Sequence, residues 1–362
     1  CKDRRRKMSR FFSSKYSALE PYVPGEQPSG MSEYVKLNTN ESPFPPSAAA
    51  KEYALRSTRA LNLYSDPDSV ELTKAIAETY GVERNMVLAT NGSDEILNFA
   101  FMAFTDGSNP ALFADITYGF YPVFADLNGS RTEIVPLRDD FTLSVDDYIG
   151  RKGTVFIANP NAPTGISLPL SEIERLVASD SSRVVVIDEA YVDFGGESAV
   201  GLTKKYDNIL VCQTFSKSRS FAGGRLGYGI GSEALISDLN TVKYSTNPYN
   251  INSMTSAMGI GILKDREYTA TNCRTIMENR DYTVKALEAM GFKVLPSSAN
   301  FIFVSSDKID GGEYYRKLKE KKILVRHFDK PRISSWCRVS IGRRDQMEAF
   351  LKATEEILKE KV

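Results

Sequence analysis

The sequence contains little histidine, cysteine or tryptophan, and it has no excess of charge of either sign. Its 362 residues include one histidine (His327), one tryptophan and four cysteines, and 46 Lys and Arg residues balance 46 Asp and Glu residues. A single histidine argues against histidine-based metal sites and against a Ser-His-Asp triad. The cysteines lack metal-ligand spacing, which is typical of reduced thiols in a cytoplasmic protein. Balanced charge provides no overall attraction for nucleic acid.

Long hydrophobic runs are also absent from the sequence. No apolar stretch approaches the roughly 20 residues that a membrane helix needs. The basic opening of the chain is followed by Phe11, Phe12 and serines rather than by the apolar region of a secretion signal. We therefore expect a cytoplasmic protein with a sizeable core, no bound metal, no nucleic-acid partner and no membrane segment.

Short apolar runs alternate with helical patterns between residues 68 and 212. Strands are expected at 86–90, 111–114, 132–136, 154–158, 184–188 and 209–212, with helices at 68–80, 91–104, 118–127, 145–149 and 170–178. This alternation predicts an α/β fold with a mostly parallel, doubly wound sheet. After about residue 250 the pattern becomes α+β. We expect a large domain at 41–250 and a small domain formed by 251–362 together with an N-terminal arm at 1–40.

Polar side chains follow several of the predicted strands. They lie in the segments 91–94 and 159–165 and at Asp188, Tyr191 and Lys217. Ligands of doubly wound sheets bind outside the carboxyl ends of the strands, so we expect these residues to share one site.

The residue types at these positions suit pyridoxal 5'-phosphate. Lys217 lies among hydroxyl residues after an apolar run, and Asp188 ends another such run. A lysine amine can form a Schiff base with the cofactor, and a buried aspartate can keep the pyridine nitrogen protonated. The phenol of Tyr191 can hydrogen-bond the ring hydroxyl.

The cofactor's phosphate also has candidate ligands. The segment Asn91–Asp94 opens a helix, and Gly92, Ser93 and Asp94 lie where free N–H groups and the helix dipole attract an anion. Ser216 and Arg225 flank Lys217, and an arginine can contact two phosphate oxygens at once.

The chain resembles the class I and II, fold type I aminotransferases, and among them most closely the histidinol-phosphate aminotransferases. Matching motifs run from Pro21-Tyr-Val-Pro-Gly25 through Thr214-Phe-Ser-Lys217 to Arg338-Val-Ser-Ile-Gly342. The resemblance implies an enzyme of histidine biosynthesis that moves an amino group from L-histidinol phosphate to a 2-oxo acid, 2-oxoglutarate, by ping-pong chemistry through a Lys217 Schiff base.

Further cofactor contacts follow from the resemblance. It implies that Thr214 helps to hold the phosphate and that Tyr118 stacks on the ring. It also implies that Tyr64 reaches the phosphate from a second subunit, which requires a homodimer. Many relatives carry an asparagine directly before Pro-Thr-Gly, where this chain has Ala162. Asn161, one residue earlier, is the nearest substitute.

The substrate residues are likewise implied by the resemblance. Arg338 matches the arginine that holds the amino-acid carboxylate, and Arg326 matches a position used for the substrate phosphate. Tyr22 and Asn40 match residues of the arm that approach the substrate. Arg343 replaces a threonine that relatives often carry, next to this group.

Two rival functions share this fold. One is a threonine-phosphate decarboxylase, and the other is an aromatic or broad-range amino-acid aminotransferase. Arg326 favours a phosphorylated substrate, which argues against the broad-range enzyme but leaves the decarboxylase open.

Overall fold

A seven-stranded sheet forms the centre of the computed structural model, which describes residues 9–30 and 33–360. Its strands are β2 (Val87–Thr90), β3 (Ala111–Ala114), β4 (Thr132–Val135), β5 (Thr154–Ala158), β6 (Val185–Asp188), β7 (Ile209–Thr214) and β8 (Gly227–Gly231). They lie in the order β2-β8-β7-β6-β5-β3-β4, and β8 alone runs against its neighbours. The predicted α/β fold with a mostly parallel sheet is confirmed. The sequence analysis missed β8.

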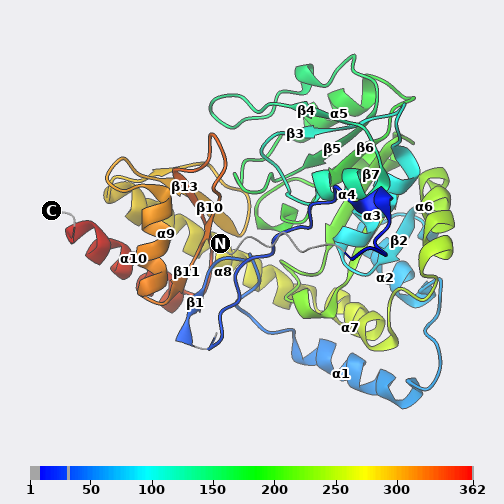
Figure 1. Cartoon of the computed structure of the whole chain (residues 1–362). Coiled ribbons are helices and arrows are strands. Elements are labelled where there is room, and N and C mark those ends of the chain that lie inside the picture. The colour runs from blue at the N-terminus through cyan, green and yellow to red at the C-terminus, as the bar shows by residue number, and fades with distance from the viewer. Residues whose placement is uncertain (1–8, 31–32, 361–362) are drawn as a thin grey trace.

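Helices cover both faces of this sheet (Figure 1). They are α2 (Val70–Tyr80), α3 (Ser93–Phe104), α4 (Tyr121–Asn128), α5 (Leu170–Ala178) and α6 (Glu233–Thr246). Along β6, Val185 and Ile187 belong to one apolar cluster and Val186 belongs to another. Strands buried on both faces read as continuous apolar runs, which is why the sequence revealed them.

A second, four-stranded antiparallel sheet lies beside the first. Its order is β12-β13-β10-β9, with β9 (Lys293–Val294), β10 (Phe301–Ser305), β12 (Arg326–His327) and β13 (Trp336–Ser340). The helices α8 (Arg266–Ala289), α9 (Gly311–Glu320) and α10 (Arg344–Lys359) pack with it. The N-terminal arm joins this part of the molecule because β1 (Val35–Lys36) pairs with β11 (Ile323–Leu324).

The helix α1 (Ala48–Ser57) packs against α7 (Ser253–Lys264) at one end of the molecule (Figure 1). Ile262 and Leu263 of α7 belong to the core of the large sheet. The part of the chain just after residue 250 thus packs with the large sheet, and the domain boundary near residue 250 stays a prediction. Short 3₁₀ turns complete the fold at Ser14–Tyr16, Thr58–Ala60, Arg84–Met86, Val145–Asp147, Val192–Phe194, Ala199–Lys204 and Ala222–Gly224.

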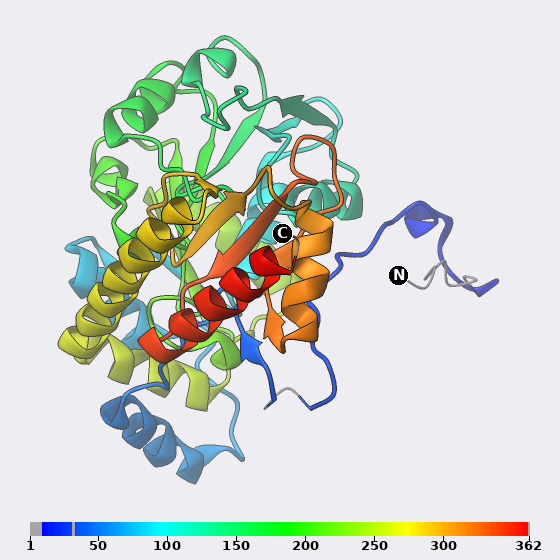
Figure 2. The ribbon, with the colours of Figure 1, turned by 90° about the vertical axis from the view of Figure 1, so that its left-hand side faces the viewer.

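The start of the described arm extends away from the rest of the chain (Figure 2). Phe11, in this segment, has 81% of its surface exposed. Within residues 9–30 and 33–360, no helix combines the length and the apolar character required to cross a bilayer.

Candidate active site

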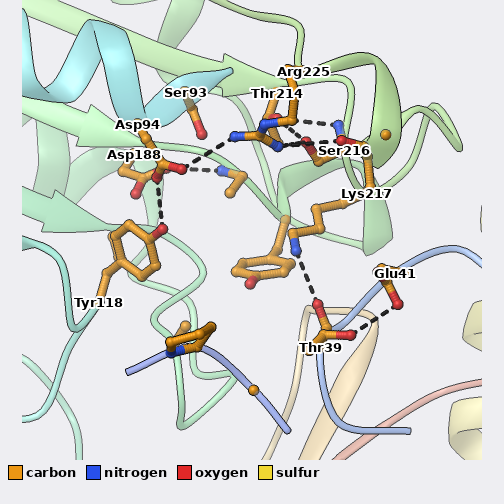
Figure 3. A pocket seen from close by; sticks show the side chains of 18 of the residues that line it. Thr39, Glu41, Ser93, Asp94, Tyr118, Asp188, Thr214, Ser216, Lys217 and Arg225 are labelled. Atoms are coloured by element: carbon orange, nitrogen blue, oxygen red, sulfur yellow. Dashed lines mark hydrogen bonds and ion pairs between the residues drawn. The ribbon is translucent and has the colours of Figure 1, made fainter. Parts of the chain in front are cut away.

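A cavity of about 330 Å³ opens beyond the carboxyl ends of β5, β6 and β7. This size suits a small cofactor. Nine of the residues predicted from the sequence line it: Ser93, Asp94, Tyr118, Asp188, Tyr191, Thr214, Ser216, Lys217 and Arg225 (Figure 3). The fold thus gathers side chains from positions spread over more than 130 residues, because parallel strands end at the same edge of a sheet.

Lys217 occupies the loop that follows β7. Its Nζ donates to the backbone oxygen of Thr39 at 3.2 Å and lies 5.8 Å from the ring centre of Tyr191 (Figure 3). A carbonyl oxygen is a weak neutral partner, so little has to be broken for the amine to react with a ligand in the cavity.

Asp188 ends β6 and is almost fully buried. Its carboxylate accepts hydrogen bonds from the Tyr121 hydroxyl at 3.1 Å and from the Ala190 N–H at 3.2 Å. Burial raises the pKa of Asp188 to about 6. Both donors are neutral, so a cationic N–H donor in the cavity can offset the cost of burying this charge.

Arg225 and the start of α3 form the anion-binding end of the cavity. Gly92, at φ +79°, precedes α3, and a Cβ at this position would lie 2.5 Å from Nη2 of Arg225. The guanidinium contacts Asp94 at 3.3 Å and Ser216 Oγ at 3.4 Å. These contacts are long and half-exposed, so an anion can displace them at little cost. Thr214 supports the group by donating to Ser216 at 3.0 Å.

Tyr118 lies across the cavity from the loop that carries Lys217. Its hydroxyl donates to Asp94 at 2.7 Å (Figure 3). Its ring meets the ring of Tyr121 edge-on, with 5.7 Å between the ring centres. Burial, with the nearby Asp94 charge, raises the pKa of Tyr118 well above its ordinary value. The phenol therefore remains neutral and keeps the ring in place at the wall of the cavity.

The loop after β5 presents Ala162, not Asn161, to the cavity. The Asn161 side chain donates to the Ile116 carbonyl at 3.0 Å and to Thr164 Oγ1 at 3.0 Å, and it accepts from Thr117 at 2.9 Å. These contacts hold the Asn161 amide within the loop. A contact between Asn161 and the cofactor stays a prediction.

Residues of the N-terminal arm also approach the cavity. Asn40 is buried, and its Nδ2 donates to the Tyr191 hydroxyl at 3.1 Å. Tyr22 stacks on Phe120 at 4.1 Å. Tyr64 lies elsewhere, with 84% of its surface exposed and its ring stacked on Tyr249 at 4.7 Å.

Arg326 and Arg338 face each other across the β12–β13 pair. Within the described residues, both guanidiniums hydrogen-bond only to backbone carbonyls, Arg326 to Val23 and Pro24 and Arg338 to Asn38. Nε of Arg338 is buried without any partner there. Burial also lowers the pKa of Arg338. Two adjacent cations that lack a carboxylate partner favour an anionic ligand.

The two remaining residues of interest near this pair have partners of their own. His327 Nε2 lies 2.7 Å from the Ser334 carbonyl oxygen. Arg343 pairs with Asp345 at 2.9 Å in the first turn of α10. Both side chains are therefore engaged outside the cavity.

The model of the family "Aminotransferase class I and II" matches residues 32–353. The chain belongs to this family. It is 46% identical over 354 residues to a histidinol-phosphate aminotransferase of Brachyspira hyodysenteriae, an alignment that covers 97% of this chain and 100% of that protein. The prediction that the chain is a member of the histidinol-phosphate aminotransferase family is confirmed.

Solved structures share the fold. The histidinol-phosphate aminotransferase of Sinorhizobium meliloti, in complex with pyridoxal-5'-phosphate, has a TM-score of 0.87 at 20% identity and covers 98% of this chain and 100% of its own. The L-threonine-O-3-phosphate decarboxylase of Porphyromonas gingivalis has a TM-score of 0.79 at 22% identity, with 90% and 99% covered. At these identities the likeness concerns the fold, which both reactions share.

The residues around the cavity fit pyridoxal phosphate. Three groups match its aldehyde, ring nitrogen and phosphate. They are the amine of Lys217, the buried carboxylate of Asp188, whose two hydrogen-bond donors among the described residues are neutral, and Arg225 beside the start of α3.

Sequence reasoning missed two contacts in this site. Tyr121 was placed in a helix without a role, although it donates to Asp188. The sequence predicts a helix from residue 118, but α4 begins at Tyr121, so Tyr118 lies before the helix and no helical spacing relates the two side chains. Thr39 holds Lys217 through a backbone oxygen, and no side-chain pattern reveals such a contact.

Proposed function

We propose that this chain is a pyridoxal-phosphate-dependent aminotransferase that uses L-histidinol phosphate as amino donor and 2-oxoglutarate as acceptor. The observation that carries the proposal is the cavity in which Lys217, Asp188 and Arg225 meet. The 46% identity to a full-length relative of that name supports the substrate.

The bound cofactor supplies an aldehyde that takes up the amino group and a ring that withdraws electrons from the adjacent carbon. Asp188 keeps the ring nitrogen protonated, and Tyr191 donates to the ring hydroxyl. Tyr118, at the wall of the cavity, would pack against the ring. Arg225 and Ser216 would hold the phosphate, together with Thr214 and with the residues at the start of α3, which are Gly92, Ser93 and Asp94.

Lys217 has two tasks in this proposal. With the cofactor bound, the amine of Lys217 would condense with the aldehyde, with loss of water, and would be released again when the substrate amine takes its place. The free Nζ would then move a proton between the carbon that bears the substrate's amino group and the cofactor. The weak contact of Nζ with the Thr39 carbonyl, at 3.2 Å, leaves the amine free to move between these positions.

Arg326 and Arg338 bind the two substrates in turn. Histidinol phosphate carries a phosphate and no carboxylate, whereas the acceptor carries two carboxylates. Arg326 and Arg338, at opposed positions of β12 and β13, provide two guanidiniums for these anions. Tyr22 and Asn40 close the arm side of the site.

The active unit in this proposal is a homodimer in which Tyr64 reaches the partner's phosphate site. Apolar side chains around Tyr64 support a contact surface, since Leu55, Leu61 and Leu63 are all more than half exposed. Mixing Tyr64→Ala with Lys217→Ala chains tests it. Hybrid dimers contain one complete site, so activity should exceed that of either parent. No gain in verified hybrids would contradict the shared site. The cytoplasmic location expected from the sequence remains a prediction.

A substrate panel tests the reaction. With 2-oxoglutarate as acceptor, kcat/KM should be highest for histidinol phosphate and at least about tenfold lower for histidinol, which lacks the phosphate and its charge-assisted hydrogen bonds. Release of carbon dioxide from O-phospho-L-threonine would instead identify the decarboxylase. A preference for phenylalanine or tyrosine over both phosphorylated compounds would identify the broad-range enzyme.

A further inference from the structure

Tyr191 is held by a buried hydrogen-bond chain that links it to the small sheet. The Asn40 N–H donates to Ser340 Oγ at 2.9 Å, and Ser340 Oγ donates to Asn40 Oδ1 at 2.7 Å. Asn40 Nδ2 then donates to the Tyr191 hydroxyl at 3.1 Å. Asn40 and Ser340 are 1% and 3% exposed.

The backbone N–H of Asn40 fixes the donor and acceptor roles in this series of hydrogen bonds. A backbone N–H only donates, so Ser340 Oγ accepts from Asn40 and turns its own hydrogen toward Oδ1. The reversed amide would leave the buried serine hydrogen without that acceptor, which is costly. Nδ2 therefore faces Tyr191, whose oxygen accepts, and the phenol hydrogen remains available to a ligand in the cavity.

The backbone conformation of Asn40 stabilises this arrangement. Its φ is +57°, in the left-handed region where asparagine is among the few tolerated side chains. Asn300 Nδ2 holds the Asn40 carbonyl at 2.9 Å. The Tyr191 ring meets Phe301 edge-on at 5.0 Å, so neither partner of the 3.1 Å contact is free to turn away.

In the loop after β5, an alanine stands at the position where a second hydrogen-bond donor would be expected. Ala162 lines the cavity where an asparagine amide would be a second donor, and the Asn161 amide is engaged within its loop. With the Asn161 amide engaged in this way, we assign the phenol of Tyr191 as donor to the cofactor's ring oxygen.

We propose that Asn40, oriented by Ser340, is a positioning residue that commits the Tyr191 hydroxyl to donate to the ring oxygen of the bound cofactor. The proposal rests on the proposed function, because it needs that cofactor in the cavity. It assigns Asn40 a role through Tyr191 in addition to its place near the substrate.

The absorbance of the bound cofactor measures this donation. A hydrogen bond to the ring oxygen stabilises its negative charge and weakens its hold on the proton that it shares with the lysine-linked nitrogen. Losing the bond therefore raises the pH midpoint of the absorbance change, by about one unit for one charge-assisted hydrogen bond. The other charged or titratable groups around Tyr191 are Lys217, Arg338 and Tyr22.

Asn40→Asp is the decisive variant. Aspartate tolerates the left-handed backbone and keeps the size of the side chain, but its carboxylate accepts from Tyr191 and turns the phenol hydrogen away from the cavity. The new charge also raises the midpoint through space. The pH titration is therefore repeated in the Tyr191→Phe background, where only the effect of the charge remains.

The expected result is that Asn40→Asp raises the midpoint by about one unit more in the Tyr191 chain than in the Tyr191→Phe chain. Equal shifts in both backgrounds would overturn the proposal. Asn38→Asp is the matched control, since Asn38 is equally buried but donates to the Glu26 carbonyl. It should shift both backgrounds equally.

Ser340→Ala provides a second test that adds no charge. It frees the Asn40 amide to reverse, so it should raise the midpoint only in the Tyr191 chain, and an equal shift in both would again contradict the proposal. If the unsubstituted chain shows no absorbance band with pyridoxal phosphate, the proposed function fails. If the band is present but the shifts are equal, only the role of Asn40 fails.

Discussion

Replacing Asp188 by asparagine should stabilise the cofactor-free chain while it removes most of the activity. Burial raises the pKa of Asp188 from 3.8 to about 6, so near neutral pH the folded chain holds a carboxylate that is more stable in the unfolded chain. The difference of about two pH units corresponds to about 3 kcal/mol. Asparagine carries no charge and removes this penalty.

The pH dependence of the effect follows from the direction of the shift. Because the folded pKa is raised, the folded chain binds the proton more tightly than the unfolded chain does, and the penalty is complete only above about pH 6. It falls below about 1 kcal/mol near pH 4. Asparagine fits the hydrogen bond from Tyr121 less well than the carboxylate, so we expect a net gain of about 1–3 kcal/mol at pH 7.5.

Urea denaturation of the cofactor-free chains, followed by circular dichroism at one protein concentration, measures this gain at pH 7.5 and pH 4. Asp180→Asn is the control, because hydrogen bonds from Ser182 lower the pKa of Asp180 and the same substitution should not stabilise the chain. The reasoning is refuted if Asp188→Asn destabilises the chain at pH 7.5, or if its gain is the same at both pH values.

Three further substitutions test the site. Lys217→Ala should abolish the covalently bound cofactor band and lower the transamination rate by more than about 10³-fold; a band that persists would place the reactive amine elsewhere. Arg225→Lys should raise the Kd of the cofactor about tenfold, measured by fluorescence titration, because one charge-assisted hydrogen bond to phosphate is lost; an unchanged Kd would move the phosphate site. Arg338→Gln should raise KM for 2-oxoglutarate at least about tenfold, and an unchanged KM would contradict its role as carboxylate ligand.

The large sheet was predictable because most of its strands are buried on both faces and appear as apolar runs. The strand β8 was not, since its sequence Gly227-Tyr-Gly-Ile-Gly231 contains three glycines. The structure explains them. A Cβ at Gly227 would lie 2.4 Å from the Ser93 nitrogen, and one at Gly229 would lie 2.9 Å from Ile96. The close packing of α3 on this strand requires glycine where propensity argues against a strand.

Some of the site residues were likewise predictable from the sequence, and others were not. Lys217, Asp188 and Arg225 were predictable because each belongs to a recognisable motif: Asp188 ends an apolar run, and Lys217 and Arg225 lie in the segment after the next one. The contacts of Asn40 with Tyr191 and Ser340 were not, because they join positions 151 and 300 residues apart. Such contacts depend on how the arm packs between the two sheets, and a single sequence carries no local pattern for it.

The central claim is that the chain transfers an amino group from histidinol phosphate through its bound cofactor. The most direct measurement adds histidinol phosphate alone to the cofactor-loaded chain, without acceptor, and determines the released ketone and the aminated cofactor by mass spectrometry. The proposal predicts one equivalent of each per Lys217 site, and return of the cofactor to its aldehyde form when 2-oxoglutarate is added. Absence of the aminated cofactor, with carbon dioxide released from O-phospho-L-threonine instead, would contradict it.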